Sequence, residues 1–83
     1  MSIDMMKENM KKEIAARIKA ALNLLNMTQK QASQESDIPY PSIRNWANAL
    51  SYPSTEFLIY LSRKGINVNW VLTGEGEPLQ KKD

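Results

Sequence analysis

The sequence predicts an all-α protein, a compact five-helix bundle, and three observations support this fold class. Apolar residues recur at the spacing of one helical face, no stretch shows the apolar and polar alternation of a strand, and capping residues stand before several of the apolar stripes. The chain has 83 residues, of which 42% are hydrophobic. This length and composition suit one small domain with a modest core, and no internal repeat is present.

The first predicted helix covers residues 14–25, whose apolar side chains lie on one helical face: Ile14, Ile18, Ala21, Leu22 and Leu25. The stripe continues backward through Ile3, Met6 and Met10. Residues 1–12 are therefore either an extension of this helix, starting near Ser2, or a frayed leader. We expect the helix to end near residues 25–27, because Asn26 tolerates the left-handed conformation that closes a helix.

A second helix is predicted at residues 29–36, directly after a T-x-x-Q capping box. In this motif the Thr28 hydroxyl accepts from a backbone amide while the Gln31 side chain reaches back to the cap. The helix is short and polar, and Ala32 and Ser33 are its small residues. Small side chains let two helix backbones approach closely, so we expect a close helix crossing here.

Two prolines mark the boundary between the second and third helices. A residue before proline is disfavoured in the helical region, so we expect Ile38 and Tyr40 to be extended. Pro41 then takes the first position of a helix, where its missing N–H is harmless. The third helix is predicted from Pro41 to about Asn48, with four residues facing the core: Ile43, Trp46, Ala47 and Leu50.

The fourth helix follows Pro53, with either Ser54 or Thr55 as its cap and Gly65 as its left-handed end. Its apolar face is formed by Phe57, Leu58 and Leu61.

The fifth helix is short, with Asn67 as its cap, the sequence VNWVL and an end at Gly74. We expect Trp70 of this helix to belong to the core, like Trp46 of the third. Residues 74–83 are polar and show no periodicity, so they are predicted to be a linker or a disordered end.

Composition argues against an enzyme. The chain contains no cysteine and no histidine, which removes thiolate chemistry, the commonest metal ligand and the commonest general base. The nine acidic residues are scattered, and the close pair Glu75 and Glu77 lies in the Gly-rich end of the chain. We expect no catalytic residue, metal or cofactor.

Charge and hydropathy indicate a cytoplasmic protein whose charge distribution is compatible with binding a polyanion. No apolar run reaches the length of a membrane span, and no signal peptide is present. The net charge is +2, but residues 7–30 carry six basic residues against two acidic ones. That asymmetry permits a nucleic-acid partner without requiring one.

Two segments resemble a known family. The stretch TQKQASQESDIPYPSIRNW resembles the helix-turn-helix of lambda-like and Cro-type phage repressors, and GINVNWVLTGEGEPL is similar to the closing helix of phage CI-type repressor DNA-binding domains. The resemblance covers residues 28–79, with the helix-turn-helix at about 28–49 and the whole DNA-binding domain at 13–73. It implies a lambda-repressor-like bundle that represses transcription by occupying a double-stranded DNA operator.

The resemblance also implies roles for individual residues. Gln29 matches the position that contacts a phosphate, and Lys30 follows it. The structural positions of the motif are matched by Ala32, Ser33, Ile38, Ile43 and Trp46. The exposed positions of the recognition helix, which docks in the major groove, are matched by Tyr40, Pro41, Ser42, Arg44, Asn45 and Asn48.

Chemistry refines three of these roles. Asn45 is the best candidate for a base contact, since Asn pairs bidentately with adenine. Arg44 suits either a guanine or, toward the flank, a phosphate. Tyr40 either packs over the turn or contacts a thymine methyl.

The sequence departs from the family pattern twice. Asp37 stands where the turn usually has Gly, so it must adopt positive φ. The PYP start removes two N–H donors from the leading edge of the recognition helix, which weakens phosphate binding there.

Low charge predicts a homodimer on an inverted repeat, with the fifth helix or the leader residues Ile3, Met6 and Met10 as the interface. The family also includes longer chains with a further C-terminal domain, which could begin beyond PLQKKD. The alternative hypothesis is a helix-turn-helix module that binds a protein, such as a toxin, an antirepressor or a polymerase subunit.

Overall fold

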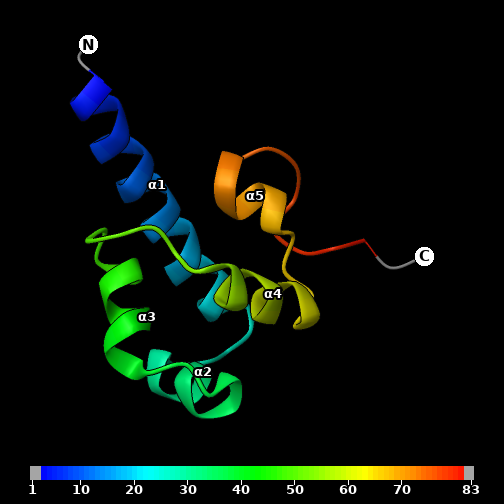
Figure 1. Cartoon of the computed structure of the whole chain (residues 1–83). Helices are drawn as coiled ribbons and strands as arrows, with labels where there is room; N and C mark the ends of the chain where they lie inside the picture. Colours follow the sequence, from blue (N-terminus) through cyan, green and yellow to red (C-terminus); the bar gives the residue numbers. More distant parts are fainter. Residues whose placement is uncertain (1–2, 82–83) are drawn as a thin grey trace.

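The computed structural model describes residues 3–81, which fold into five helices around one core (Figure 1). The helices are α1 (Ile3–Leu24), α2 (Gln29–Ser36), α3 (Tyr40–Ala47), α4 (Thr55–Arg63) and α5 (Val68–Thr73). The long α1 contacts both α3 and α5, while α2 packs on α3 and α4 packs on α5. The predicted all-α bundle of five helices is confirmed.

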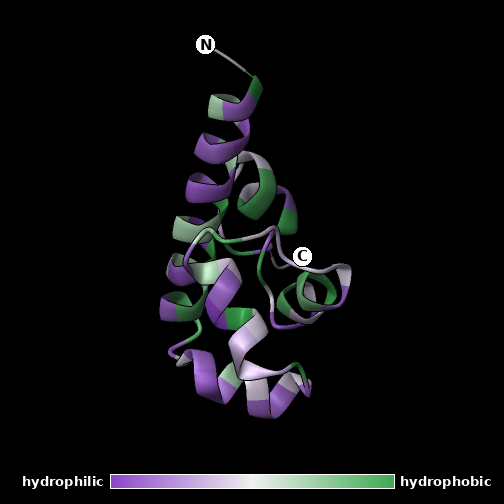
Figure 2. Ribbon diagram, turned by 60° about the vertical axis from the view of Figure 1, so that its left-hand side comes forward, coloured by the Kyte–Doolittle hydropathy of each residue, from purple (hydrophilic) through white to green (hydrophobic). Residues whose placement is uncertain are grey.

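The core draws side chains from every helix and from the connection before α5. Its most buried members have no exposed surface at all: Ile18, Ala21, Ala32, Ile43, Ala47, Phe57, Leu61, Ile66 and Val71. Figure 2 shows that α2, at the bottom of the view, is drawn almost entirely in polar colours. Its single fully buried residue, Ala32, is small enough for the α2 backbone to approach the core closely.

The helix predicted at residues 14–25 begins much earlier, at Ile3. Residues 3–12 therefore extend α1 instead of fraying, and in Figure 1 they project beyond the other helices. A start near Ser2 lies outside the described residues. The stripe formed by Ile3, Met6 and Met10 continues the core face of α1 but is 47–70% exposed. At the other end, Asn26 has a φ of 57° and closes the helix as predicted.

The connection from α2 to α3 differs by one residue from the prediction. α2 covers the predicted range, and both hydrogen bonds of its capping box are formed. Pro39, with φ −56° and ψ 135°, is the extended residue that caps α3, and its carbonyl accepts from Ser42 and Ile43. The prediction that Tyr40 is extended was therefore wrong. Tyr40 is the first residue of α3, because Pro41 at the second position still needs no N–H donor.

The prediction that Leu50 is buried was also wrong, since 67% of this residue is exposed. Ala49 has a φ of 62°, and the Leu50 amide donates to the Asn45 carbonyl over 2.9 Å. This left-handed turn ends α3 and takes Leu50 out of the helical stripe. Trp46 and Trp70 are half-buried and pack on the rim of the core, with the Trp46 ring centroid 5.3 Å from that of Phe57.

The last two helices begin and end at the predicted residues. Ser54 is the cap of α4 and accepts from the Phe57 amide, and Gly65 closes the helix with a φ of 98°. Asn67 caps α5, and Gly74 ends it with a φ of 80°.

Arg17 joins α5 to α1. Its guanidinium donates to the Val71 carbonyl over 3.2 Å. A Cβ added at Gly74 would lie 2.7 Å from the Arg17 Nη2 atom, which is the movable end of a long side chain, so it is the φ of 80° that requires glycine there.

The polar segment after α5 folds back on the bundle as far as Gln80, so the expectation of a disordered end does not hold for residues 77–80. The Asn67 amide donates to the Pro78 carbonyl and the Gln80 amide donates to the Gly65 carbonyl, each over 2.8 Å. The Gln80 side chain donates further to the Ser62 and Ile66 carbonyls. Backbone pairing of this kind leaves no periodic pattern of side chains.

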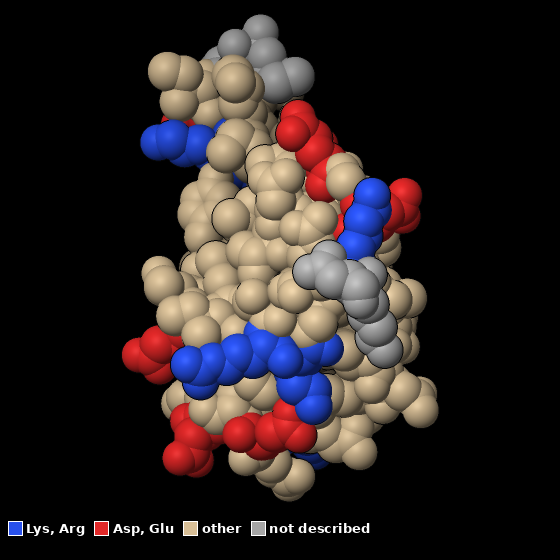
Figure 3. Space-filling model, turned by 90° about the vertical axis from the view of Figure 1, so that its right-hand side faces the viewer, with Lys and Arg blue, Asp and Glu red and all other residues tan. Residues whose placement is uncertain are grey.

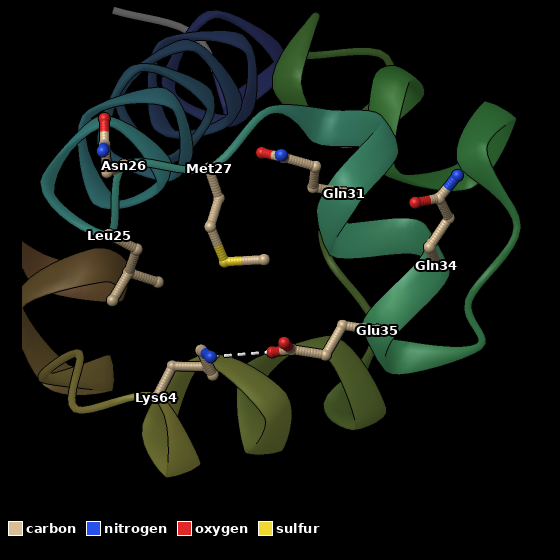
Figure 4. Close-up of a pocket in the computed structure, with 7 residues that line it drawn as sticks. All are labelled: Leu25, Asn26, Met27, Gln31, Gln34, Glu35 and Lys64. Atoms are coloured by element: carbon tan, nitrogen blue, oxygen red, sulfur yellow. Dashed lines mark ion pairs between the residues drawn. The ribbon is translucent and has the colours of Figure 1, made fainter.

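A three-residue network holds α2 against α4. Glu35 Oε1 of α2 lies 2.8 Å from the Lys64 ammonium and accepts from the Tyr60 hydroxyl over 2.9 Å. Figure 4 shows the Lys64 to Glu35 pair at the edge of a recess between the two helices. The Lys64 and Tyr60 hydrogen bonds lower the pKa of Glu35, and burial together with Glu35 raises the pKa of Tyr60 to about 12.

This network makes stability depend on pH at the acid end. Because the folded-state pKa of Glu35 lies below its ordinary value of 4.5, its contribution is present above that value and is lost as the pH falls through the lowered pKa. We predict that Glu35→Gln lowers the melting temperature at pH 7 and that the difference from wild type is smaller at pH 3 than at pH 7.

Glu75→Gln is the matched control, since Glu75 is exposed and forms no ion pair with any residue of 3–81. Equal effects of Glu35→Gln at both pH values in thermal unfolding would contradict the network's role.

Candidate functional site

The turn between α2 and α3 sets the direction of α3. Asp37 adopts φ 65° and ψ 16°, and its amide donates to the Ser33 carbonyl over 2.9 Å. The Ser33 hydroxyl donates to the Ile38 carbonyl over 2.6 Å, and the Ile38 amide donates to the Ser36 hydroxyl oxygen over 3.2 Å. Both polar backbone groups of Ile38 are therefore satisfied by side chains of α2, which ties the start of α3 to the end of α2.

The five residues predicted to be structural lie on the inner side of α2 and α3. Ala32 and Ile43 are fully buried, and Ile38 is 8% exposed. Ser33 is half-buried in the turn, and Trp46 is half-buried at the rim. Because Ile43 and Ala47 face the core, the opposite side of α3 faces solvent.

The predicted contact residues differ in exposure. Those that are exposed are Lys30, Pro41, Arg44, Asn45 and Asn48. Those that are half-buried are Gln29, Tyr40 and Ser42. The side chains of Asn45 and Asn48 form no hydrogen bond with any described residue, so their amide groups are free for a ligand.

Tyr40 brings together cations from two helices, which the sequence did not predict. The Lys30 ammonium of α2 lies 5.7 Å from the centre of the Tyr40 ring, and the Arg44 guanidinium of α3 lies 5.8 Å from it. Both distances fall within the range of cation–π attraction. The ring therefore positions both positive charges at one edge of the helix pair. The sequence could have predicted only the contact of Tyr40 with Arg44, because these residues are four apart on one helix.

These two cations are not neutralised within the chain. Among residues 3–81, neither Lys30 nor Arg44 forms an ion pair with a carboxylate. The face on the side of α4 and the C-terminal segment is different, since acidic side chains lie beside the basic ones on it in Figure 3. Lys64 on that side pairs with Glu35. Uncompensated positive charge combined with free amides is the chemistry that binds phosphates and base edges.

The start of α3 has few donors to offer. Pro39 and Pro41 lack an N–H, so the first backbone amides of this helix are depleted as the sequence implied. A ligand at α3 must therefore be held by side chains further along the helix. The opposite holds at α2, where Gln29 and Lys30 are the first two helical residues and their amides have no partner within the helix.

Two further lysines, missed as individual site residues by the sequence analysis, border the site from α1. Lys19 lines a recess with Asn48 and another with Gln29, and Lys12 lines the first of these. Their separation of seven residues, which places them on one side of a helix, was the available signal. Among the described residues, no helix is both long and apolar enough to cross a membrane.

Comparison with known proteins agrees with this geometry. A family model described as helix-turn-helix matches residues 18–64, which is more than half of the chain and includes all of α2, α3 and α4. Comparisons with curated proteins and with solved structures found no match.

Proposed function

Because the chain belongs to the Cro/CI-type helix-turn-helix family, a family of DNA-binding regulatory domains and not of enzymes, we propose that it is a sequence-specific transcriptional repressor of phage type. It reads an operator with α3 in the major groove and represses by occupying that operator. The observation that carries this proposal is the outer face of α3. There, Tyr40 holds two unpaired cations beside the free amides of Asn45 and Asn48.

The proposed contacts divide by chemistry. Asn45 lies near the middle of the exposed face and pairs with an adenine through its amide. Gln29, Lys30 and Asn48 contact phosphates on either side of the groove. Arg44 is turned toward the Tyr40 ring at the edge of the face, which favours a phosphate over a guanine.

Tyr40, Pro41 and Ser42 form the leading edge of α3. Tyr40 is engaged with Lys30 and Arg44, so its main contribution is to orient these two cations. Ser42 and Pro41 contact the bases by shape complementarity, because the two prolines leave few backbone amides for hydrogen bonds there.

Binding requires two copies of the chain. One copy carries a net charge of only +2, and an interface with few phosphate contacts is weak at physiological salt. We propose a homodimer on an inverted repeat, with half-sites about 34 Å apart, one turn of the double helix. Two surfaces are available for the dimer contact: the exposed leader stripe of α1 with Met6 and Met10, and the surface of α5 with the 42% exposed Leu72.

The test of the function is fluorescence anisotropy with labelled 30-base-pair duplexes from the region upstream of the protein's own gene, each paired with a scrambled duplex. We expect at least one duplex to bind about 10³-fold more tightly than its scrambled version. Equal affinity for all duplexes, or no binding at low salt, would contradict the proposal and favour a helix-turn-helix module that binds a protein.

A second experiment locates the reading residue. Asn45→Ala is expected to cost about 1–3 kcal/mol of binding free energy on the preferred duplex and little on its scrambled version. Arg44→Ala is expected to lower the affinity for both duplexes equally if Arg44 contacts a phosphate. Gln34→Ala, which removes an exposed amide of α2 outside the assigned contacts and both candidate dimer surfaces, is the matched control and should leave both affinities unchanged. An Asn45→Ala protein that is folded and binds like wild type would refute the assigned role of α3.

The dimer is tested by sedimentation of the complex with an inverted-repeat duplex. We expect two protein chains for each duplex. Met6→Asp with Met10→Asp reduces this ratio to one if the leader is the interface, and Leu72→Asp does so if α5 is. A ratio of one for the wild-type protein would overturn the dimer, and a ratio of two in both variants would rule out both surfaces.

A further inference from the structure

One edge of α1 faces the helix-turn-helix across two shallow recesses that share Lys19. The first lies between α1 and the end of α3, and its lining is Lys12, Ala15, Ala16, Lys19, Ala47, Asn48 and Ala49. The second lies between α1 and the start of α2, and its lining is Lys19, Leu22, Asn23, Met27, Thr28 and Gln29. We call the lining of these two recesses, from Lys12 to Gln29, the α1 edge.

Small residues keep the α1 edge open. Ala15 and Ala47 are buried where α1 and α3 meet, and no large side chain lies between Lys12 and Lys19. These two lysines are seven residues apart, so they stand on the same side of α1, about 10 Å apart along its axis. That spacing allows each ammonium group to reach a different phosphate.

In the part of the chain that the structure describes, the lysines of the α1 edge are not paired with carboxylates, although Asp4 and Glu8 line a third recess together with Lys12. Within residues 3–81, neither Lys12 nor Lys19 forms an ion pair, and no carboxylate lines either recess. Glu8, one turn before Lys12, pairs with Lys11 over 3.5 Å instead. Arg17, whose side chain lies against α5, pairs with Glu13 over 3.6 Å. The two ion-paired cations of α1 thus line neither recess, whereas Lys12 and Lys19 line the recesses and form no ion pair with any described residue.

The α1 edge also adjoins the contacts assigned to DNA. Asn48 lines the first recess and Gln29 lines the second, and Lys19 lines both. Lys19 therefore lies between the end of the recognition helix and the start of α2, where the two proposed phosphate contacts are made.

We propose that the α1 edge is an additional contact with the DNA phosphate backbone, made by Lys12 and Lys19. The inference rests on the proposed function and extends it, because the footprint then continues past the bases read by α3. Lysine is a point charge without the forked geometry that reads a base edge, so this contact adds affinity equally on every sequence.

The test compares the wild type with a double variant that carries both Lys12→Gln and Lys19→Gln. Binding to a mixed-sequence 24-base-pair duplex is measured by fluorescence anisotropy between 50 and 200 mM KCl. Two lost phosphate contacts reduce the slope of log affinity against log salt by about 2. The affinity ratio of wild type to variant should therefore fall about tenfold over this salt range. The double variant should lose affinity by the same factor on a preferred duplex as on the mixed-sequence duplex.

The control is Lys7→Gln with Lys81→Gln, which removes the same charge from two exposed lysines that line neither recess. This control should keep the wild-type slope. A double variant of the α1 edge that behaves like the control would overturn the inference. A lowered melting temperature with an unchanged slope would do so as well, because the lysines would then only stabilise the end of α3.

The two proposals fail separately. If the wild-type protein shows no sequence preference, the repressor function fails while the slope comparison on mixed-sequence DNA still decides whether the α1 edge contacts phosphates.

Discussion

The position of α3 depends on one constraint, the left-handed turn at Asp37. The Ser33 hydroxyl donates to the Ile38 carbonyl over 2.6 Å on one side of this turn, and Pro39 caps α3 on the other. With the turn fixed, Ile43 and Ala47 face the core and the opposite side of α3 faces solvent. An aspartate at positive φ is costly, so the side-chain hydrogen bonds across the turn are what make this conformation the stable one.

Function follows from what the turn leaves exposed. Tyr40 lies at the start of α3, where its ring meets Lys30 from the preceding helix and Arg44 one turn later. The prolines at the start of α3 also lack backbone donors, so the proposed recognition rests on side chains further along the helix. The network of Glu35 with Tyr60 and Lys64 links α2 to α4 and so ties the helix-turn-helix to the rest of the bundle.

The fold was predictable wherever a local pattern carried the information. Capping boxes, apolar stripes and Gly or Asn stops act within a few residues, and α2, α4 and α5 follow them closely. The burial of Leu50 was predicted wrongly because the apolar stripe was continued past Ala49. Ala49 is left-handed, and without a glycine at this position the sequence did not indicate that the helix ends there. The return of Gln80 to the bundle was not predictable, because it depends on backbone hydrogen bonds. The contact of Lys30 with Tyr40 arises across a turn and required the tertiary structure.

The most direct measurement of the central claim is a set of amide proton–nitrogen correlation spectra of the labelled protein, recorded as a duplex selected for binding from a random pool is added. If α3 enters the groove and the start of α2 contacts phosphates, the largest shift changes fall on residues 28–31 and 40–48, with α4 little affected. Changes concentrated on α4, or spread evenly over the chain, would contradict this account of the helix-turn-helix as the reading surface.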